Sequence, residues 1–226
     1  MLSSLLPAEV AVAESFDDPE DAVLFPGEEA VIARAVDKRR REYITTRHCA
    51  RLALAQLGIP PAAIGTGGNR EPLWPDGIVG SMTHCAGYRA AAVARSGGAV
   101  AGLGVDAEPH APLPDGVFDT IARPDEVPAL AALAAARSEV QWDRLLFSAK
   151  ESVYKAWFPV ARRWLGFEEA SLDFAADGRN PAPETAAGEI VTGTFSARIH
   201  QSGAPLTRMS GRWIVGSGLV VTAIAL

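Results

Sequence analysis

The chain has 226 residues, of which 48% are hydrophobic and 21% are charged, and its formal net charge is −6. This length fits one large domain or two small lobes. A net negative charge gives no general basic footprint for nucleic acid, and no apolar run reaches the roughly 18 residues that a membrane span needs. The N-terminus lacks the basic segment of a secretory signal, so we expect a cytoplasmic protein that binds neither nucleic acid nor a membrane.

The first firm helix is predicted over residues 38–57, where Gly58 and the prolines after it stop the pattern. Its buried face is formed by residues that recur at helical spacing: Tyr43, Ala50, Ala53, Leu54 and Leu57. Arg40, Arg47 and Arg51 form a stripe beside that face. The stripe is either a solvated helix edge or part of an anion site.

Four further segments of the first half have clear patterns. Residues 1–37 are acidic and loop-like at first, with a helical pattern beginning near their end. The glycine-rich stretch 65–72 indicates a hairpin or surface loop and lacks the Gly-Lys-Ser/Thr of a phosphate-binding loop. Residues 79–94 contain two strand-like pieces, and 100–107 indicates another strand.

The two cysteines, Cys49 and Cys85, have no metal-type spacing, and buried thiols in a reducing cytosol fit them better than a disulfide or metal pair.

The second half repeats this order of elements. A loop and a weak helix are expected over 109–137, followed by a firm helix over 139–157. Strands are then predicted at 170–175 and 189–199, and a closing hairpin at 211–225.

The order helix, strands, loop, helix, strands predicts an α+β protein with two similar lobes, in which a long helix packs on each sheet. We place the division after residue 104, which gives an N-terminal lobe of 1–104 and a C-terminal lobe of 105–226. The size and this organisation favour a monomer.

Lysine usage singles out the second firm helix. The chain has 21 lysine and arginine residues, and its three lysines are Lys38, Lys150 and Lys155. Two of them flank Glu151, and lysine differs from arginine in being a compact charge that loses its proton when it is desolvated. The pattern therefore indicates a site that uses the amine. The alternative is an ordinary surface ion pair between Glu151 and Lys155.

Acidic residues supply a second candidate cluster. Asp106 and Glu108 are two apart at a predicted strand end, so both carboxylates project from one face. Adjacent like charges favour a cation between them, and Mg²⁺ usually takes one or two carboxylates. Glu151 is a candidate third acid, whereas solvated acids at a turn are the plainer interpretation. His84, beside Thr83, is either a satisfied buried histidine or a phosphate contact together with an arginine such as Arg47.

Five segments resemble one enzyme family. Gly104-Val105-Asp106-Ala107-Glu108 resembles the G-[IV]-D-x-E signature of the 4′-phosphopantetheinyl transferases, and Phe147 to Lys155 resembles their [FW]-x-x-K-E-x-x-x-K signature. Ser81-Met82-Thr83-His84 is similar to their S-[LIM]-[ST]-H segment. Residues 43–51 and 70–76 resemble stretches of the bacterial branch that activates surfactin and enterobactin synthetases.

The resemblance implies two pseudo-two-fold-related α+β lobes with the active site in the cleft between them. It implies transfer of 4′-phosphopantetheine from coenzyme A to a serine of an acyl or peptidyl carrier protein, which releases adenosine 3′,5′-bisphosphate. The implied cofactor is Mg²⁺, with Mn²⁺ as an alternative, and coenzyme A is the co-substrate. Fatty-acid, polyketide, nonribosomal-peptide and siderophore pathways all stay open.

The resemblance also implies residue roles. The metal ligands would be Asp106, Glu108 and Glu151. The catalytic residues would be Asp106, Glu151 and Lys155. Contacts to coenzyme A would come from Arg39, Arg47, Arg70, Thr83, His84, Lys150 and Lys155, with Arg39 and Arg47 on the 3′-phosphate, Thr83 and His84 on the adenosine phosphate end and the lysines on the diphosphate. Arg162 and Arg163, beside Trp157, Phe158 and Trp164, are candidates for a carrier-docking rim or for ordinary packing.

Two other functions compete with the transferase. A coenzyme A diphosphate hydrolase would need a helix with a cluster of water-activating glutamates, and the sequence has none. A catalytically silent carrier-binding module would be expected to have lost an acid or the lysine of the motif, whereas Asp106, Glu108, Glu151 and Lys155 are all present.

Overall fold

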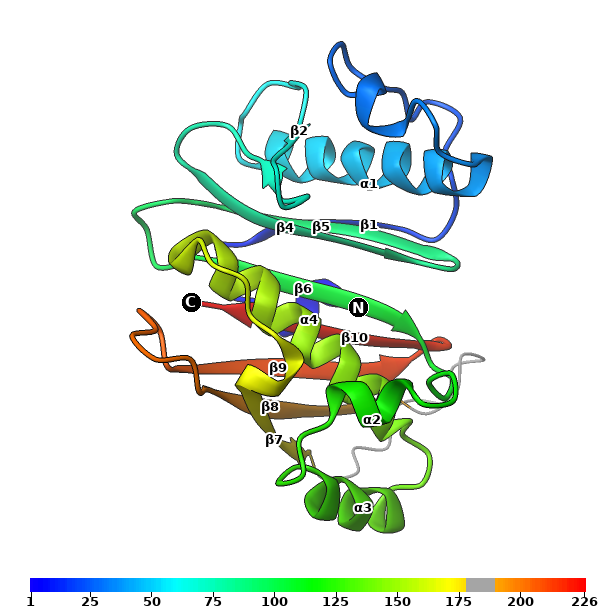
Figure 1. Cartoon of the computed structure of the whole chain (residues 1–226). Helices are drawn as coiled ribbons and strands as arrows, with labels where there is room; N and C mark the ends of the chain where they lie inside the picture. The colour runs from blue at the N-terminus through cyan, green and yellow to red at the C-terminus, as the bar shows by residue number, and fades with distance from the viewer. Residues whose placement is uncertain (178–189) are drawn as a thin grey trace.

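The computed structural model describes residues 1–177 and 190–226, which form two main sheets with a long helix on each and a small two-stranded sheet (Figure 1). This arrangement confirms the predicted α+β class and the order of its elements. The chain passes from the first sheet to the second between β5 (Tyr88–Arg95) and β6 (Leu103–Pro109). The proposed division after residue 104 stays a prediction.

The N-terminal sheet has three antiparallel strands in the order β1-β5-β4, where β1 is Ala11–Ser15 and β4 is Ile78–Cys85. The helix α1 (Asp37–Gln56) covers one of its faces (Figure 1). The core beneath α1 is built from small and branched side chains of the helix, the strands and the following loop: Cys49, Ala50, Ala53, Leu54, Ile64, Ala91 and Val93. The predicted apolar face of this helix is therefore the buried one.

The C-terminal sheet has five antiparallel strands in the order β6-β10-β9-β8-β7. The remaining strands are β7 (Ala170–Ala176), β8 (Val191–Ile199), β9 (Arg208–Gly216) and β10 (Leu219–Ala225). The helix α4 (Trp142–Ala161) lies across β6 and β10, and Trp157 and Trp213 are fully buried in the core beneath it.

A third core joins the two sheets. Alanines on β5 and small residues on β6 pack against Val221 and Ala223 of β10 and against Leu2 and Leu5 of the short helix η1 (Leu2–Leu5). Because β5 has α1 on one face and this core on the other, nearly all of its residues are buried. The two lobes are therefore layers of one packed body.

Some boundaries differ from the sequence expectations. β1 lies inside the segment expected to be a loop. The sequence does not predict it, because its Ala-Val-Ala-Glu-Ser pattern is short and only partly buried. The second long helix begins at Trp142 and runs to Ala161, beyond its predicted end. Of the strand predicted from 189, residue 189 lies outside the described residues. The shorter elements are η2 (Glu29–Ile32), β2 (Gly65–Thr66), β3 (Pro72–Leu73), α2 (Val117–Ile121), α3 (Val127–Ala136) and η3 (Phe167–Glu169).

Cys49 and Cys85 are both free and buried, as the sequence indicated. Burial raises the pKa of the Cys49 thiol to about 11. Across the described ranges, no helix is both long and apolar enough to cross a membrane.

Candidate active site

Asp106 and Lys155 form the centre of the site, where α4 crosses β6. The Nζ of Lys155 lies 2.7 Å from Oδ1 of Asp106 and donates a second hydrogen bond, 3.1 Å long, to the carbonyl of Val105. Burial alone would lower the pKa of Lys155, but the charges of Asp106 and Glu151 raise it above its ordinary value. The amine is therefore charged at neutral pH.

Gly104 allows this close approach of helix and strand. A Cβ atom at Gly104 would lie 2.0 Å from the carbonyl oxygen of Ser152 and 2.7 Å from the amide nitrogen of Ala156. These are backbone atoms of α4, which cannot rotate away as a side chain would. A glycine at this position of β6 therefore lets α4 bring Glu151 and Lys155 to Asp106.

Two hydroxyls of β4 hold β6 in place. The amide of Val105 donates to Oγ of Ser81 at 3.0 Å, and the amide of Ala107 donates to Oγ1 of Thr83 at 3.0 Å. The Thr83 hydroxyl in turn donates to Oδ1 of Asp106 at 3.3 Å. These bonds connect the two sheets at the site, where no backbone ladder joins β4 to β6.

Glu108 and Glu151, the two other acids of the site, have raised pKa values. Burial and the charge of Asp106 raise the pKa of Glu108 to about 7, although Arg144, 3.1 Å away, offsets part of this effect. Burial also raises the pKa of Glu151, with Asp106 adding to the shift and Lys155 opposing it. Asp106 therefore acts on the pKa of both glutamates, and a cation beside it would relieve this repulsion.

A divalent ion has some of the donors it needs here. Asp106 has a buried oxygen, Oδ2, without a hydrogen-bond partner, and such atoms in native structures need an explanation. However, within residues 1–177 and 190–226 no group of three or more His, Cys, Asp or Glu side chains is arranged as a ready metal cage. Mg²⁺ usually binds through one or two carboxylates plus water and substrate phosphates, so these donors fit Mg²⁺ better than a metal bound by protein alone.

A second cluster on α1 and β4 faces the same region. His84 contacts the Arg39 guanidinium, and its Nε2 lies 3.5 Å from the Glu42 carboxylate. Burial and the charges of Arg39 and Lys155 lower the pKa of His84 to about 4, so the ring is neutral at physiological pH. The sequence reasoning missed Glu42, although its spacing of three residues from Arg39 and four from Lys38 indicates such pairing.

Lys150 is not part of this site, which corrects the expectation that it contacts the diphosphate. Its Nζ donates to Oε2 of Glu126 at 2.8 Å and to the carbonyls of Ile121 and Phe167, and both charged side chains are almost fully buried. Glu126 also accepts the amides of Arg123 and Leu172. The pair joins α4 to the segments around it.

The arginine stripe on α1 is also largely structural. Arg51 forms a buried pair with Glu28 at 3.0 Å, and Arg40 donates to the carbonyl of Ile32. Arg47 lies over the Tyr43 ring and donates to the carbonyl of Ile64 and the hydroxyl of Thr66, and burial lowers its pKa to about 10. Its Nη1 makes no hydrogen bond to the described residues, so Arg47 keeps a donor group for a ligand.

Three other expected contacts are placed as follows. Thr83 is 2% exposed and its hydroxyl is used between β4 and β6, so it does not face a ligand as expected. Arg70, in the β2–β3 turn with a φ of 68°, is exposed, and its side chain has no partner among the described residues. Trp157 and Phe158 are buried and cannot form a docking rim, whereas Trp164 is 70% exposed and contacts Tyr154.

Comparisons with known proteins agree with the motifs. Residues 27–94 match the family model of the 4′-phosphopantetheinyl transferase N-terminal domain, and residues 102–201 match the model of the 4′-phosphopantetheinyl transferase superfamily. The chain therefore belongs to this superfamily, and the resemblance noted in the sequence is confirmed.

Three curated relatives cover the whole chain. It is 50% identical to the 4′-phosphopantetheinyl transferase PptT of Mycobacterium tuberculosis, covering 100% of this chain and 98% of that protein. It is 47% identical to the 4′-phosphopantetheinyl transferase Npt of Nocardia iowensis, covering 100% and 99%, and 50% identical to the 4′-phosphopantetheinyl transferase Svp of Streptomyces mobaraensis, covering 100% and 89%. The chain is accordingly an enzyme of the transferase class.

Proposed function

We propose that this enzyme moves the 4′-phosphopantetheine group of coenzyme A to a serine hydroxyl of an apo acyl or peptidyl carrier protein. A bond forms between the serine oxygen and the phosphorus, and the phosphorus–oxygen bond to the leaving phosphate breaks, which releases adenosine 3′,5′-bisphosphate. The observation that carries the proposal is the charged Lys155 amine bound to Asp106, with Glu108 and Glu151 each close enough to Asp106 for its charge to raise their pKa.

Asp106, Glu108 and Glu151 are the residues that would hold Mg²⁺, or Mn²⁺ in its place. Asp106 offers its unpartnered Oδ2, while Glu108 would exchange its contact with Arg144 for the ion. When bound, the ion neutralises charge on the diphosphate oxygens.

Glu151 and Lys155 suit the two proton positions of the reaction. The raised pKa of Glu151 makes it a stronger base than an exposed glutamate, which favours removal of the serine proton directly or through a water. Lys155 is charged and offsets the negative charge that develops on the leaving phosphate, to which it also supplies a proton.

The adenosine phosphates of coenzyme A would lie against α1 and β4. Arg39 is half exposed beside the neutral His84, which keeps ring hydrogen-bonding capacity without adding charge. The free Nη1 of Arg47 and the exposed Arg70 are the other candidates on the N-terminal lobe. Guanidinium groups bind phosphate with two parallel hydrogen bonds, which suits them to this end of the substrate.

The direct test uses purified enzyme, coenzyme A, Mg²⁺ and several purified apo carrier proteins. We expect intact-mass spectrometry to show a gain of one phosphopantetheine group, and no gain on a carrier whose acceptor serine is replaced by alanine. Asp106→Asn serves as the inactive enzyme control. Release of free phosphopantetheine without modification of any carrier would indicate a hydrolase instead, and a folded enzyme that modifies no carrier would contradict the proposal.

We also propose that the enzyme acts as a monomer in the cytoplasm. The packed core between the two sheets supports a single chain as the folded unit. Light scattering coupled to size-exclusion chromatography tests the monomer, and a mass of two chains would contradict it.

A further inference from the structure

The outer face of the five-stranded sheet is open over β8 and β9. Side chains alternate along each strand, and the inward residues of both strands are buried beneath α4. The outward residues are exposed: Thr194, Ser196 and Arg198 on β8, and Arg208, Ser210 and Arg212 on β9. No described residue covers this part of the sheet.

Three arginines concentrate positive charge on this open surface. We call Arg198, Arg208 and Arg212 the arginine face. Arg198 lies directly opposite Arg208 in the β8–β9 ladder, and Arg212 lies opposite Thr194. Like charges placed directly opposite each other on neighbouring strands are unfavourable, and none of the three guanidinium groups has a hydrogen bond or an ion pair with the described residues.

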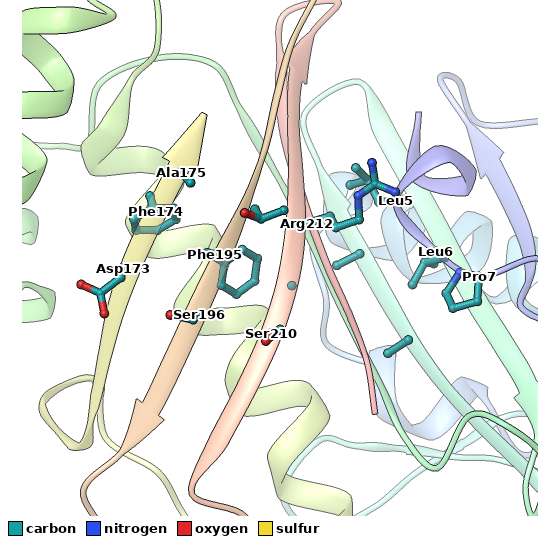
Figure 2. A pocket seen from close by; sticks show the side chains of 14 residues that line it. Leu5, Leu6, Pro7, Asp173, Phe174, Ala175, Phe195, Ser196, Ser210 and Arg212 are labelled. Atoms are coloured by element: carbon teal, nitrogen blue, oxygen red, sulfur yellow. The ribbon is translucent and has the colours of Figure 1, made fainter. Parts of the chain in front are cut away.

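A hollow of about 730 Å³ lies beside the Arg198–Arg208 pair, and Arg212 is the member of the arginine face that lines it (Figure 2). Its floor consists of small side chains such as Ser196 and Ser210, while Leu5 of η1 stands beside Arg212 at one side and Asp173 on β7 marks the other. The hollow contains none of Asp106, Glu108, Glu151 and Lys155. It is therefore separate from the candidate active site, and it lies on the opposite face of the sheet from α4.

We infer that the arginine face docks an acidic segment of a protein partner. Free guanidinium forks pair with carboxylates through two parallel hydrogen bonds, and the small floor leaves room for an extended backbone. Asp173 lies opposite Ser196, in the row between the Arg198–Arg208 pair and Arg212, so it disfavours acidic side chains over the middle of this surface and favours them at the arginines on either side. A nucleic acid fits less well, because three arginines on a chain of net charge −6 do not provide a broad basic footprint.

The test measures fluorescence anisotropy of a fluorescein-labelled hexaglutamate peptide with the full chain at low ionic strength. We expect the double variant R198Q/R208Q to weaken binding at least tenfold. R34Q is the matched control, because Arg34 is another exposed arginine without a partner among the described residues, and it should leave binding unchanged. Because exposed charges are screened by salt, added NaCl should weaken binding to the unaltered chain more than binding to R198Q/R208Q.

Two further arms make the result decisive. If the peptide is lost from R39Q and kept by R198Q/R208Q, it binds at the active site and the inference is wrong. If a labelled hexathymidylate binds as tightly as the peptide and is weakened equally by R198Q/R208Q, the surface is a general anion patch and the inference is also wrong. Equal peptide binding by the unaltered chain and by R198Q/R208Q overturns it as well.

Discussion

Lys150 and Lys155 show how two identical side chains five residues apart on one helix acquire different roles. A separation of five residues turns the helix by roughly 140°, so the two amines leave α4 on different sides. Lys155 faces Asp106, whereas Lys150 enters a buried pocket with Glu126 and two backbone carbonyls. In both cases a carboxylate compensates for the burial of the amine. For Lys155 this is Asp106 of the active site, and for Lys150 it is the enclosed Glu126.

Lys150→Met should therefore destabilise the enzyme much more than it impairs chemistry. It leaves the Glu126 carboxylate buried without its cation, and breaking a buried pair in this way costs about 3–5 kcal/mol. Urea denaturation measures the loss, and Lys38→Met, at an exposed lysine, is the control with little effect. If the variant keeps its stability but loses its activity, Lys150 belongs to the active site after all.

Glu108 should make the free energy of unfolding of the metal-free enzyme depend on pH. Its pKa is raised on folding from 4.5 to about 7, so the folded state holds the proton more tightly, and the stability contribution of Glu108 falls as pH rises through that window. The loss is a few kcal/mol at most, since one pKa unit corresponds to about 1.4 kcal/mol. Measured without divalent ions, the free energy of unfolding should decrease from pH 5 to pH 7.5, and this decrease should be larger for the unaltered chain than for Glu108→Gln. Identical slopes would show that Glu108 is not the cause.

At the scale of single residues, the sequence predicts the acidic residues of the site well. It predicts the roles of the basic residues less well. Asp106, Glu108 and Glu151 lie in short motifs whose spacing already implies a shared face or a nearby helix. Arg47 and Arg51 are predicted as a surface stripe because a helical wheel shows which residues share a face but not what packs against it. The partners of Arg51 and Arg47, namely Glu28 and Ile64, come from loops distant in sequence.

At the scale of elements, the contact of α4 with β6 determines whether the site exists. Gly104→Ala would place a Cβ within 2.0 Å of a helix carbonyl, so α4 has to move away from β6. We expect a stability loss of about 1–3 kcal/mol, typical of overpacking, and a larger loss of turnover because Lys155 moves away from Asp106. Turnover and thermal unfolding should be compared with Gly102→Ala, where the nearest atom is the flexible Leu226 side chain at 3.1 Å. Equal effects of the two substitutions would remove the special role of Gly104.

Periodicity predicts the long elements and misses the short ones for a physical reason. α1 and α4 have many turns over which an apolar face repeats, so their existence and buried faces follow from the sequence. β1 has five residues and only one of them, Ala11, is buried, which leaves almost no alternation to detect. α3 is so rich in alanine that its two faces look alike, so its pattern indicates a helix only weakly.

For the whole molecule, the two lobes meet at the site through hydroxyls in place of a backbone ladder. Ser81 and Thr83 each accept one amide of β6, but Thr83 alone also donates to Asp106. Ser81 lies opposite Ala92 and Thr83 opposite Ala90 in the β4–β5 ladder, so both hydroxyls are fixed by the N-terminal sheet. The position of an acid on the C-terminal lobe thus depends on a side chain of the other lobe.

This dependence can be measured with a matched pair of variants. Ser81→Ala and Thr83→Val each leave one buried amide of β6 without an acceptor, so each should lower the free energy of unfolding by about 1–3 kcal/mol. Only Thr83→Val also frees the Asp106 carboxylate, so it should reduce turnover at least several-fold beyond Ser81→Ala at equal folded fraction. Turnover with a single carrier protein, normalised by the fraction folded in urea titrations, separates the two effects. If both variants lose activity only in proportion to their stability, the hydroxyl joins the lobes without positioning the acid, and Lys155 alone orients Asp106.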